Sequence, residues 1–366
     1  MTRARAAVLR DSPGRLEIEE IDIDLPDSKE VLVRTVASGL CHSDLHFIEG
    51  KYTPQLPLVV GHEVAGVVEA VGSDVDYVKP GDHVVGCLSV FCGECAYCVT
   101  GRPYLCRSIS VKRAPGSKPR LSSGGVELHQ NGQLGGFAEM LLVHEHAIVR
   151  IDPEMPLDRA ALLGCGTITG VGAVFNTAKV TPGATVAVIG CGGVGLNVVQ
   201  GAVIAGASRV IAVDLLASKL ELARRFGATE TVDASQVNAV DAVREITDGG
   251  VEFAFEAIGL KTTAEQAFEM LARGGTATVI GLIPAGERVS LLASDLWVAE
   301  KRLQGSSMGS NRFRYDIPRL VDLYLGGRLN LDDLISARIT LDEVNDGFSR
   351  LKAGAVARSV IEFDGC

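Results

Sequence analysis

TVAVIGCGGVGLNVVQGAVIAGASRVIAVD, residues 185–214, indicates the fold of this chain more clearly than any other segment. It begins with a β-branched apolar run, Thr185–Ile189, continues through a Gly-x-Gly-x-x-Gly turn, and ends in a second apolar run. In a turn of this kind between a strand and a helix, backbone N–H groups approach a pyrophosphate at the helix N-terminus. The residues expected to bind a dinucleotide there are Gly190, Gly192, Gly193, Val194 and Gly195.

Asp214 ends the second apolar run, at the distance from the turn where an acidic residue accepts hydrogen bonds from ribose hydroxyls. Its carboxylate would repel a 2′-phosphate, and the next residues, Leu215 and Leu216, offer that phosphate no arginine. The pattern therefore favours NAD over NADP. Lys219 either adds a ribose contact or is a surface lysine, and the alternative for the whole unit is a packing turn without a nucleotide.

The regions before and after about residue 165 differ in their pattern of apolar runs and turn signals. Up to about residue 165, short β-branched runs such as Val31–Val36 and Val64–Val71 alternate with turn signals, which is typical of a β-rich domain. From Thr181 to Ser306 strands alternate with helical stretches, which predicts a doubly wound parallel sheet. Its expected elements are Thr185–Ile189, Val194–Ala205, Val210–Val213, Ser218–Phe226, Val251–Phe255, Thr262–Leu271 and Thr276–Ile280. A final strand at Ser359–Phe363 is expected to rejoin the first domain, so the second domain is inserted into the first.

The composition argues against two classes of partner, nucleic acids and membranes. The 366 residues carry 35 Lys and Arg against 45 Asp and Glu, a formal net charge of −10, which disfavours binding to nucleic acid through a basic face. Val180–Ser208 is uncharged and long enough to cross a bilayer, but its seven glycines and Pro182 indicate a strand, a turn and a packed helix. We therefore expect neither a nucleic acid nor a membrane as partner.

Four cysteines lie within fifteen residues, in a lobe at residues 92–106. Cys-x-x-Cys steps supply tetrahedral thiolate ligands to structural zinc, whereas dense disulfides belong to small secreted domains. The alternative is a set of unrelated buried thiols or a local disulfide knot. The ligands expected for this zinc are Cys92, Cys95, Cys98 and Cys106.

The number of cysteines also indicates the cellular compartment in which the protein is expected. There are nine cysteines, an odd number, and no signal peptide precedes them. We therefore expect a reducing, cytoplasmic location. The cysteines outside any ligand pattern are expected to be free thiols: Cys87, Cys191 and Cys366.

Three further residues, Cys41, His62 and Cys165, are far apart, and spacing alone gives them no common role. The motifs that surround these three residues do indicate a common role. The motifs that carry the resemblance are GLCHSDLH at residues 39–46, GHE at 61–63, GCGTITG at 164–170, the cysteine lobe and the glycine turn. Together they resemble the zinc-dependent medium-chain alcohol dehydrogenases, over almost the whole chain.

The resemblance implies both architecture and activity. A Rossmann domain at residues 168–307 would be inserted into a β-rich, GroES-like catalytic domain at residues 1–167 and 308–366. The chain would be an NAD-dependent oxidoreductase with two zinc ions, transferring a hydride between an alcohol or aldehyde and NAD. A homodimer or a homotetramer is expected.

The family's catalytic zinc ligands match Cys41, His62 and Cys165, which leave a fourth position for water or substrate. Asp44 matches a carboxylate that orients the imidazole of His62. Glu63 lies beside the metal in the family, either as a transient ligand or in an electrostatic or structural role.

Ser43 and His46 match a relay that carries the alcohol proton to solvent, and the ordinary histidine pKa of about 6.5 suits the last transfer. His42 matches a contact to the cofactor pyrophosphate, with a surface histidine as the alternative. The remaining cofactor contacts implied by the family are Thr169, Ile258, Leu282 and Arg358. Their alternatives are a helix hydroxyl, two core residues and a surface charge.

The sequence departs from the branch of the family that oxidises glutathione-bound formaldehyde. That branch holds its thiol adduct with an acidic residue and an arginine, where this chain has Tyr52 and Ser110. Apolar residues are expected to line the substrate site, which favours a hydrophobic primary alcohol or aldehyde: Leu88, Val111 and Leu282. The alternatives are a polyol or thiol-adduct dehydrogenase and a non-catalytic zinc-binding protein. Arg107–Gly135 carries no assigned role, and three histidines are expected to be structural or on the surface: His129, His144 and His146.

Overall fold

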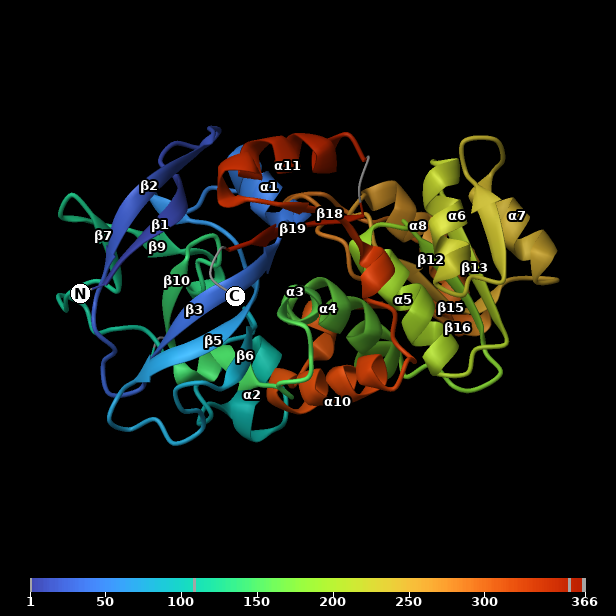
Figure 1. Cartoon of the computed structure of the whole chain (residues 1–366). Coiled ribbons are helices and arrows are strands. Elements are labelled where there is room, and N and C mark those ends of the chain that lie inside the picture. Colours follow the sequence, from blue (N-terminus) through green and yellow to red (C-terminus); the bar gives the residue numbers. More distant parts are fainter. Residues whose placement is uncertain (1, 108–109, 355–356, 364–366) are drawn as a thin grey trace. The chain divides into compact units, whose positions relative to one another are not determined.

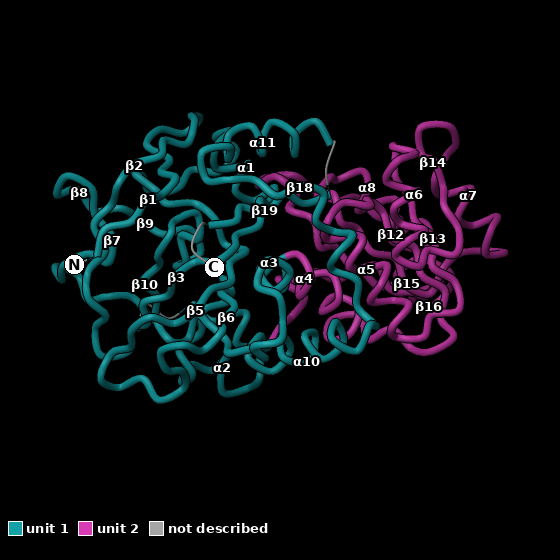
Figure 2. The backbone as a smooth tube through the Cα atoms, viewed as in Figure 1, with its two compact units in different colours: residues 1–165, 312–366 teal, residues 166–311 magenta. Residues whose placement is uncertain are grey.

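The computed structural model describes residues 2–107, 110–354 and 357–363. The chain folds into two compact units, residues 1–165 with 312–366 (unit 1) and residues 166–311 (unit 2), as shown in Figure 2. The domain boundaries expected from the sequence, near residues 167 and 308, lie a few residues from these divisions.

Unit 2 is built on a six-stranded parallel sheet in the order β14-β13-β12-β15-β16-β17, of which Figure 1 labels β12, β13, β15 and β16. The order of the strands therefore reverses between β12 and β15, which is the place where open α/β sheets bind ligands. The strands are β12 (Thr185–Ile189), β13 (Arg209–Asp214), β14 (Glu230–Asp233), β15 (Val251–Glu256), β16 (Leu271–Val279) and β17 (Arg302–Gly305). The α-helices are α4 (Gly166–Gly172), α5 (Gly193–Ile204), α6 (Ala217–Arg225), α7 (Ala239–Ile246), α8 (Lys261–Glu269) and α9 (Ala293–Trp297). The predicted doubly wound sheet is confirmed.

Two predicted boundaries in unit 2 differ from the structure, by two and by five residues. The helix expected through Leu271 ends at Glu269, and the strand expected from Thr276 already begins at Leu271. The physical reason is pairing, because Leu271 lies opposite Val251 of β15 and is buried in the core. Tertiary packing here overrides the local helical pattern.

The apolar run at residues 180–208 contains β12, the glycine turn and α5, as predicted. Both the strand and the helix are largely buried, since the sheet carries apolar side chains on both faces. Among the described residues no single helix is long and apolar enough to cross a membrane, although one bent pair of helices reaches that length and composition.

Unit 1 holds two sheets, and it is β-rich as predicted. The first has the order β8-β7-β2-β1-β4-β9, and the second has the order β11-β6-β5-β3-β19-β18, with β10 also pairing with β3. The strands are β1 (Thr2–Leu9), β2 (Leu16–Ile23), β3 (Glu30–Gly39), β4 (Leu58–Val59), β5 (Glu63–Val71), β6 (His83–Gly86), β7 (Leu121–Ser123), β8 (Val126–Glu127), β9 (His129–Gln130), β10 (Met140–His144), β11 (Ile148–Arg150), β18 (Ile335–Ile339) and β19 (Arg358–Glu362). The α-helices are α1 (His42–Ile48), α2 (Ala96–Val99), α3 (Leu157–Ala160), α10 (Phe313–Leu325) and α11 (Val344–Lys352).

The last strand closes the unit as expected. β19 pairs antiparallel with β3, so Val360 lies opposite Gly39. On its other edge β3 pairs with β5, which places Gly39 opposite Glu63. Three segments that are distant in the sequence therefore meet at one end of this sheet.

Candidate functional site

A buried group of ligand-type side chains lies at that end of the sheet. One ligand atom from each of Cys41, His62, Glu63 and Cys165 lies within 4.8 Å of the others. Cys41 precedes α1, His62 and Glu63 stand at the start of β5, and Cys165 follows the 3₁₀ turn Ala161–Gly164. The two cysteines are 5% and 6% exposed and His62 is 1% exposed, so water reaches none of the three freely.

Asp44 orients the imidazole within this group. Its Oδ1 accepts a hydrogen bond from the Gly61 N–H at 3.0 Å and lies 3.1 Å from Nδ1 of His62. With the proton on Nδ1, Nε2 presents its lone pair to the cysteine sulfurs, and this atom has no hydrogen-bond partner among the described residues. Two thiols, one imidazole and an orienting carboxylate fit a zinc ion that keeps one open position.

The charges and hydrogen bonds within the group favour a thiolate at Cys41 but keep a second proton on His62, which must leave when a metal binds. Hydrogen bonding from Cys165 and the charge of His62 lower the pKa of Cys41 well below its ordinary value, against the effect of burial. Burial lowers the pKa of His62, but the charges of Asp44 and Cys41 outweigh it and raise that pKa well above the ordinary value. A thiolate is thus favoured at Cys41, and the thiolate is the form that binds metal.

Glu63 and Arg358 form a buried ion pair beside these ligands. Nη2 of Arg358 lies 3.3 Å from Oε1 of Glu63, and the two side chains are 5% and 0% exposed. Burial raises the pKa of Glu63 to about 7, with Arg358 opposing the shift. The guanidinium expected at the cofactor pyrophosphate therefore contacts Glu63 in this structure, and the surface-charge alternative does not fit its burial.

The three predicted relay and pyrophosphate residues lie on α1. The Oγ of Ser43 lies 3.7 Å from the sulfur of Cys41, and His42 is exposed. His46 packs edge-on against Tyr52, with 5.7 Å between ring centroids. Burial and the charge of Lys51 lower the pKa of His46.

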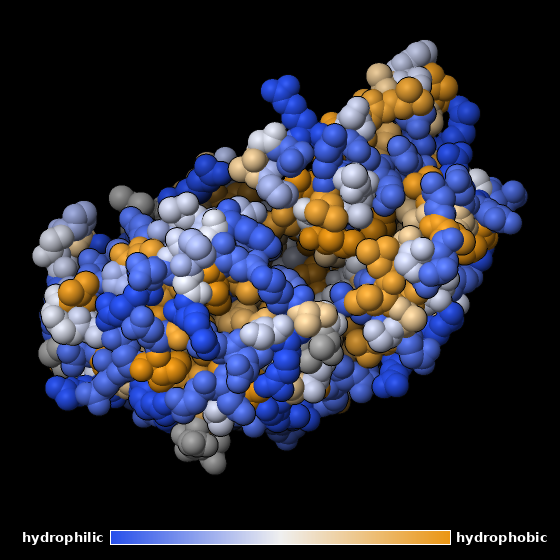
Figure 3. Space-filling view, turned by 90° about the horizontal axis from the view of Figure 1, so that it is seen from above, coloured by the Kyte–Doolittle hydropathy of each residue, from blue (hydrophilic) through white to orange (hydrophobic). Residues whose placement is uncertain are grey.

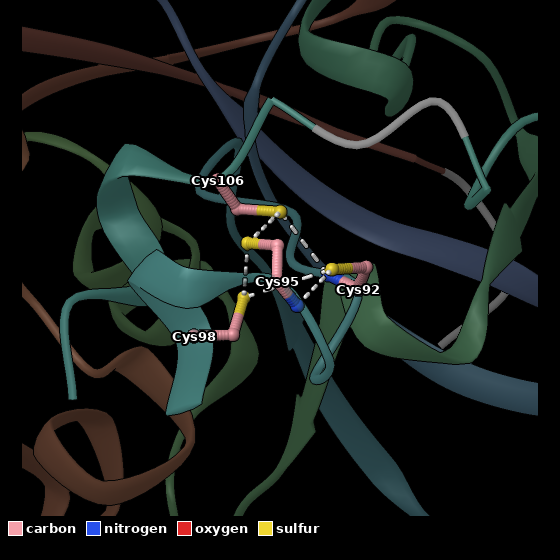
Figure 4. A group of neighbouring side chains, drawn as sticks. All are labelled: Cys92, Cys95, Cys98 and Cys106. Carbon is pink, nitrogen blue, oxygen red and sulfur yellow. Dashed lines mark hydrogen bonds between the residues drawn. The ribbon is translucent and has the colours of Figure 1, made fainter. Parts of the chain in front are cut away.

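The cysteine lobe lies in the same unit, but its four thiols all come from one short loop. Cys92, Cys95, Cys98 and Cys106 point their sulfurs toward a common centre (Figure 4), with sulfur–sulfur distances of 3.5 to 3.9 Å among the hydrogen-bonded pairs. Backbone N–H groups of Cys92 and Cys95 each donate to a cysteine sulfur at 3.3 Å. A hydrogen bond from the Glu94 backbone leads the effects that lower the pKa of Cys92 to about 6. Four thiols in this arrangement fit a closed tetrathiolate site.

The glycine turn of unit 2 has room for a phosphate. Gly190 has φ +93°, and a Cβ on Gly195 would come within 1.7 Å of the carbonyl oxygen of Gly190, so neither position accepts a side chain. A Cβ on Gly192 would meet no described atom within 4 Å, which leaves open space above the N-terminus of α5. That combination fits a pyrophosphate.

Asp214 stands at the carboxyl end of β13, next to this turn. Its Oδ2 accepts from the Cys191 N–H at 2.8 Å, and its Oδ1 accepts from the N–H groups of Leu215 and Leu216 at 2.8 and 3.1 Å. The carboxylate is therefore fixed in direction. Lys219 lies half-buried near the start of α6.

The other predicted cofactor residues lie at the same end of the sheet or in the helix before it. Ile258 and Leu282 follow β15 and β16 and are 47% and 54% exposed, so the alternative that both are core residues is wrong. Thr169 is buried in α4, and its hydroxyl lies 3.6 Å from the sulfur of Met308.

Comparison with known proteins supports the same family as the geometry. The Alcohol dehydrogenase GroES-like domain profile matches residues 27–153, and the Zinc-binding dehydrogenase profile matches residues 193–325. An NDMA-dependent alcohol dehydrogenase from Amycolatopsis methanolica is 42% identical, over 98% of this chain and 98% of that protein. The chain belongs to the zinc-dependent medium-chain alcohol dehydrogenases.

Other members of the family show the same full-length agreement. A class-3 alcohol dehydrogenase from Myxine glutinosa is 37% identical over 98% of this chain and 97% of that protein. The crystal structure of benzyl alcohol dehydrogenase from Acinetobacter calcoaceticus superposes with a TM-score of 0.94, at 34% identity, covering 99% of this chain and all of that one. The expected fold, a Rossmann domain inserted into a GroES-like domain, is thereby confirmed.

Some residues in this family member lie elsewhere than expected. Val111 was predicted to line the substrate site, but it is 2% exposed and packs in the core of unit 1 with Leu134 and Leu141, because its short apolar side chain fits that core. Leu88 packs against the edge of the same cluster, and Ser110 is exposed.

The remaining cysteines and histidines have structural surroundings. Cys87 and Cys191 are buried free thiols, and burial raises their pKa values to about 11 and about 12. His146 stacks on Phe91, directly before the cysteine lobe, with 4.6 Å between ring centroids. His144 ends β10 and His129 begins β9. Cys366 lies outside the described residues.

Sequence reasoning missed two residues of the sites. Glu256, fully buried at the end of β15, accepts hydrogen bonds from the N–H groups of Ile258 and Gly259 at 2.8 and 2.7 Å and so shapes the loop that carries Ile258. Asn131 contacts Asp44 from the loop that had no assigned role. An acidic residue directly after the predicted strand Val251–Phe255 was a usable signal for Glu256, whereas no motif marks Asn131.

Proposed function

We propose that this protein is an NAD-linked, zinc-dependent alcohol dehydrogenase acting on hydrophobic primary alcohols or their aldehydes. The observation that carries the proposal is the buried set Cys41, His62 and Cys165, with Asp44 orienting the imidazole. Bound there, zinc would polarise the oxygen of the substrate, and NAD would accept or supply the hydride.

The protein's own groups would hold, orient and move protons. Ser43 lies against the ligand Cys41 and is proposed to take the alcohol proton, which His46 then passes to solvent. The lowered pKa of His46 keeps its imidazole neutral near pH 7, so it is able to accept that proton. Glu63 and Arg358 would balance the charge of the buried site. The second zinc is proposed on Cys92, Cys95, Cys98 and Cys106, with no vacancy for substrate.

NAD is proposed as the cofactor because of Asp214. Its carboxylate is fixed by three backbone N–H groups beside the open glycine turn, where a 2′-phosphate would meet negative charge. Cofactor contacts are proposed for Gly190, Gly192, Gly193, Val194, Gly195, Lys219, Ile258, Leu282, Thr169, His42 and Arg358. One relative is named an NDMA-dependent alcohol dehydrogenase, so the test also asks whether NDMA is needed to accept the electrons.

A thiol-adduct dehydrogenase is the second candidate. A relative from Saccharomyces cerevisiae that is named S-(hydroxymethyl)glutathione dehydrogenase favours it, at 37% identity. Tyr52 and Ser110 stand against it, because neither offers the charge expected for holding the adduct. Tyr52 instead packs on the ring of His46.

We also propose that copies of the chain assemble into a homodimer or homotetramer, and that the protein works in a reducing cytoplasm, which keeps thiol ligands unoxidised. Unit 2 exposes large apolar side chains close together in the sequence, Leu292 at 67%, Leu296 at 47% and Trp297 at 76%. Hydrophobic residues also gather in several patches on the face shown in Figure 3. Patches of this kind mark association surfaces. Sedimentation of the purified protein as a monomer would contradict the assembly.

The function is tested by following NADH absorbance with a graded series of primary alcohols, and with aldehydes plus NADH in reverse. Parallel reactions contain NADP in place of NAD, NDMA in addition to NAD, or the adduct of formaldehyde and glutathione. We expect turnover that rises with the apolar length of the alcohol and that needs NAD. Turnover confined to the glutathione adduct would establish the second candidate instead.

A further inference from the structure

The side chain of Asn131 lies against the buried ligand group, with its Nδ2 3.4 Å from Nδ1 of His62. Its Nδ2 donates to Oδ1 of Asp44 at 2.6 Å. The same oxygen lies 3.0 Å from the Gly61 N–H and 3.1 Å from Nδ1 of His62, so three donors converge on one atom. Asp44 is fully buried, and its other oxygen has no hydrogen-bond partner among the described residues. The direction of this carboxylate therefore depends on those three contacts.

The backbone around Asn131 holds the amide in place. Asn131 begins the 3₁₀ turn η2 (Asn131–Gln133), in which Gly132 and Gln133 have φ values of 59° and 61°. Gln133 is not a glycine, so its left-handed conformation costs energy and persists only where the surroundings impose it. A Cβ on Gly132 would approach Cβ of Leu88 to 2.8 Å and that of His62 to 3.7 Å. The turn is thus packed directly against the histidine.

The end of the turn is fixed as well. The carbonyl oxygen of Asn131 accepts from the Leu134 N–H at 2.9 Å, and Leu134 is fully buried. Gly136 donates its N–H to the carbonyl oxygen of Gly61 at 2.8 Å, which ties the loop to the residue before His62. A rigid neutral amide in this place points one N–H at Asp44 and adds no charge to the site.

We propose that Asn131 is a positioning residue for the zinc ligand His62. By holding Oδ1 of Asp44 in the path of the His62 Nδ1–H, it would keep Nε2 of the imidazole directed toward the two cysteine sulfurs. Partners outside the ligand shell typically change metal affinity by about 10- to 100-fold when removed. This inference rests on the proposed zinc site and extends it to the loop Arg107–Gly135.

The test is the release of zinc to a chromogenic chelator, with the metal of the buried site identified by its absence in Cys41→Ser. Asn131→Ala removes the donor and is expected to weaken zinc binding at the buried site about 10-fold. Asn131→Asp keeps the shape of the side chain but sets a carboxylate against Asp44, so a larger loss is expected. The zinc of the cysteine lobe is expected to leave at the wild-type rate in both variants.

Asn345→Ala is the matched control. Asn345 lies in the same unit, and its side chain exchanges two hydrogen bonds with the backbone of Leu16, at 3.1 and 2.9 Å. Losing them changes stability but is expected to leave zinc release unchanged. Cobalt(II) in place of zinc gives a second readout, because its visible spectrum reports ligand geometry and is expected to shift only in the Asn131 variants.

The possible results distinguish a failure of the positioning role of Asn131 from a failure of the proposed zinc-dependent function. A Cys41-dependent zinc phase that both Asn131 variants leave unchanged, or that Asn131→Ala weakens more than Asn131→Asp, would overturn the positioning role alone. A wild-type protein with no Cys41-dependent phase would overturn the proposed function and this inference with it.

Discussion

The two groups of candidate zinc ligands are brought together in opposite ways. The lobe takes four thiols from fifteen consecutive residues, leaves them partly exposed, and supports them with backbone N–H groups of the same loop (Figure 4). The other group takes its ligands from three distant segments, buries them, and surrounds them with Asp44, Asn131 and the pair Glu63–Arg358. A closed site can thus be made by one loop. A site with a free position needs buried polar groups that only the whole fold supplies.

The largest effect is expected when one ligand is removed from the buried group. Cys165→Ser is expected to lower kcat/KM for an alcohol about 10³-fold or more, because three ligands must hold the metal that polarises the substrate. The measurement is NADH formation at saturating NAD. Cys87→Ala is the control, since Cys87 is also a buried thiol but stands outside both ligand groups. Equal losses in the two variants would show that only buried packing was disturbed.

Removing one ligand from the lobe is expected to act on stability instead. Cys98→Ser should release the lobe zinc and, where free zinc exceeds its Kd about 1,000-fold, lower the free energy of unfolding by about 4 kcal/mol. Denaturant unfolding measures the loss, and limited proteolysis should cut within residues 92–106. A kcat reduced as far as in Cys165→Ser would contradict the separation of roles.

The loop after the lobe is held by charges, which allows a pH-dependent test. Arg113 Nη1 contacts Asp24 at 2.7 Å and its Nη2 contacts Glu30 at 2.6 Å, with side chains 12%, 18% and 4% exposed. Burial alone would raise the pKa of Asp24, but hydrogen bonds from Lys118 and Arg113 outweigh it and lower the pKa to about 2. The pKa of Glu30 is lowered in the same way.

Lowered carboxyl pKa values contribute stability above the ordinary values near 4, and this contribution is lost as the pH falls from about 4 toward 2. Arg113→Met is therefore expected to cost about 2 to 3 kcal/mol at pH 7 and progressively less below pH 4. Urea unfolding at a series of pH values measures the difference between wild type and variant. A difference that stays constant with pH would mean that packing, and not charge, holds this loop.

The smallest expected effect concerns the cofactor turn of unit 2, which has no metal ligand. Asp214→Gly should change the ratio of kcat/KM for NAD to that for NADP about 10-fold toward NADP, because the charge facing a 2′-phosphate is gone. Initial rates with each cofactor measure it. An unaltered ratio would remove Asp214 from the ribose site.

The sequence predicted those parts of the molecule that are encoded locally. The lobe spacing and the strand, glycine turn and helix at residues 185–204 each lie within one short stretch, and the structure has them in place. The final strand was expected at Ser359–Phe363 and is found at Arg358–Glu362. Their physical causes, thiolate spacing and alternation of apolar runs, are visible without a fold.

Parts that depend on packing were predicted less well. Val111 looked like a pocket residue because it is apolar in a loop, yet it fills a core formed by strands far away in the sequence. Arg358 remains a proposed pyrophosphate contact, but its burial against Glu63 was not predicted, because it follows only from the pairing of β19 with β3 and of β3 with β5. Asn131 carried no signal, because a single amide gains its partner only when the turn closes over His62.

Counting the zinc ions in each chain decides whether the two sites are separate. Elemental analysis of freshly purified wild type, Cys41→Ser and Cys98→Ser, each with its protein concentration measured independently, should give two, one and one. A wild-type value of one or zero, or an equal zinc content in all three proteins, would contradict the account of a buried reactive site beside a separate structural lobe.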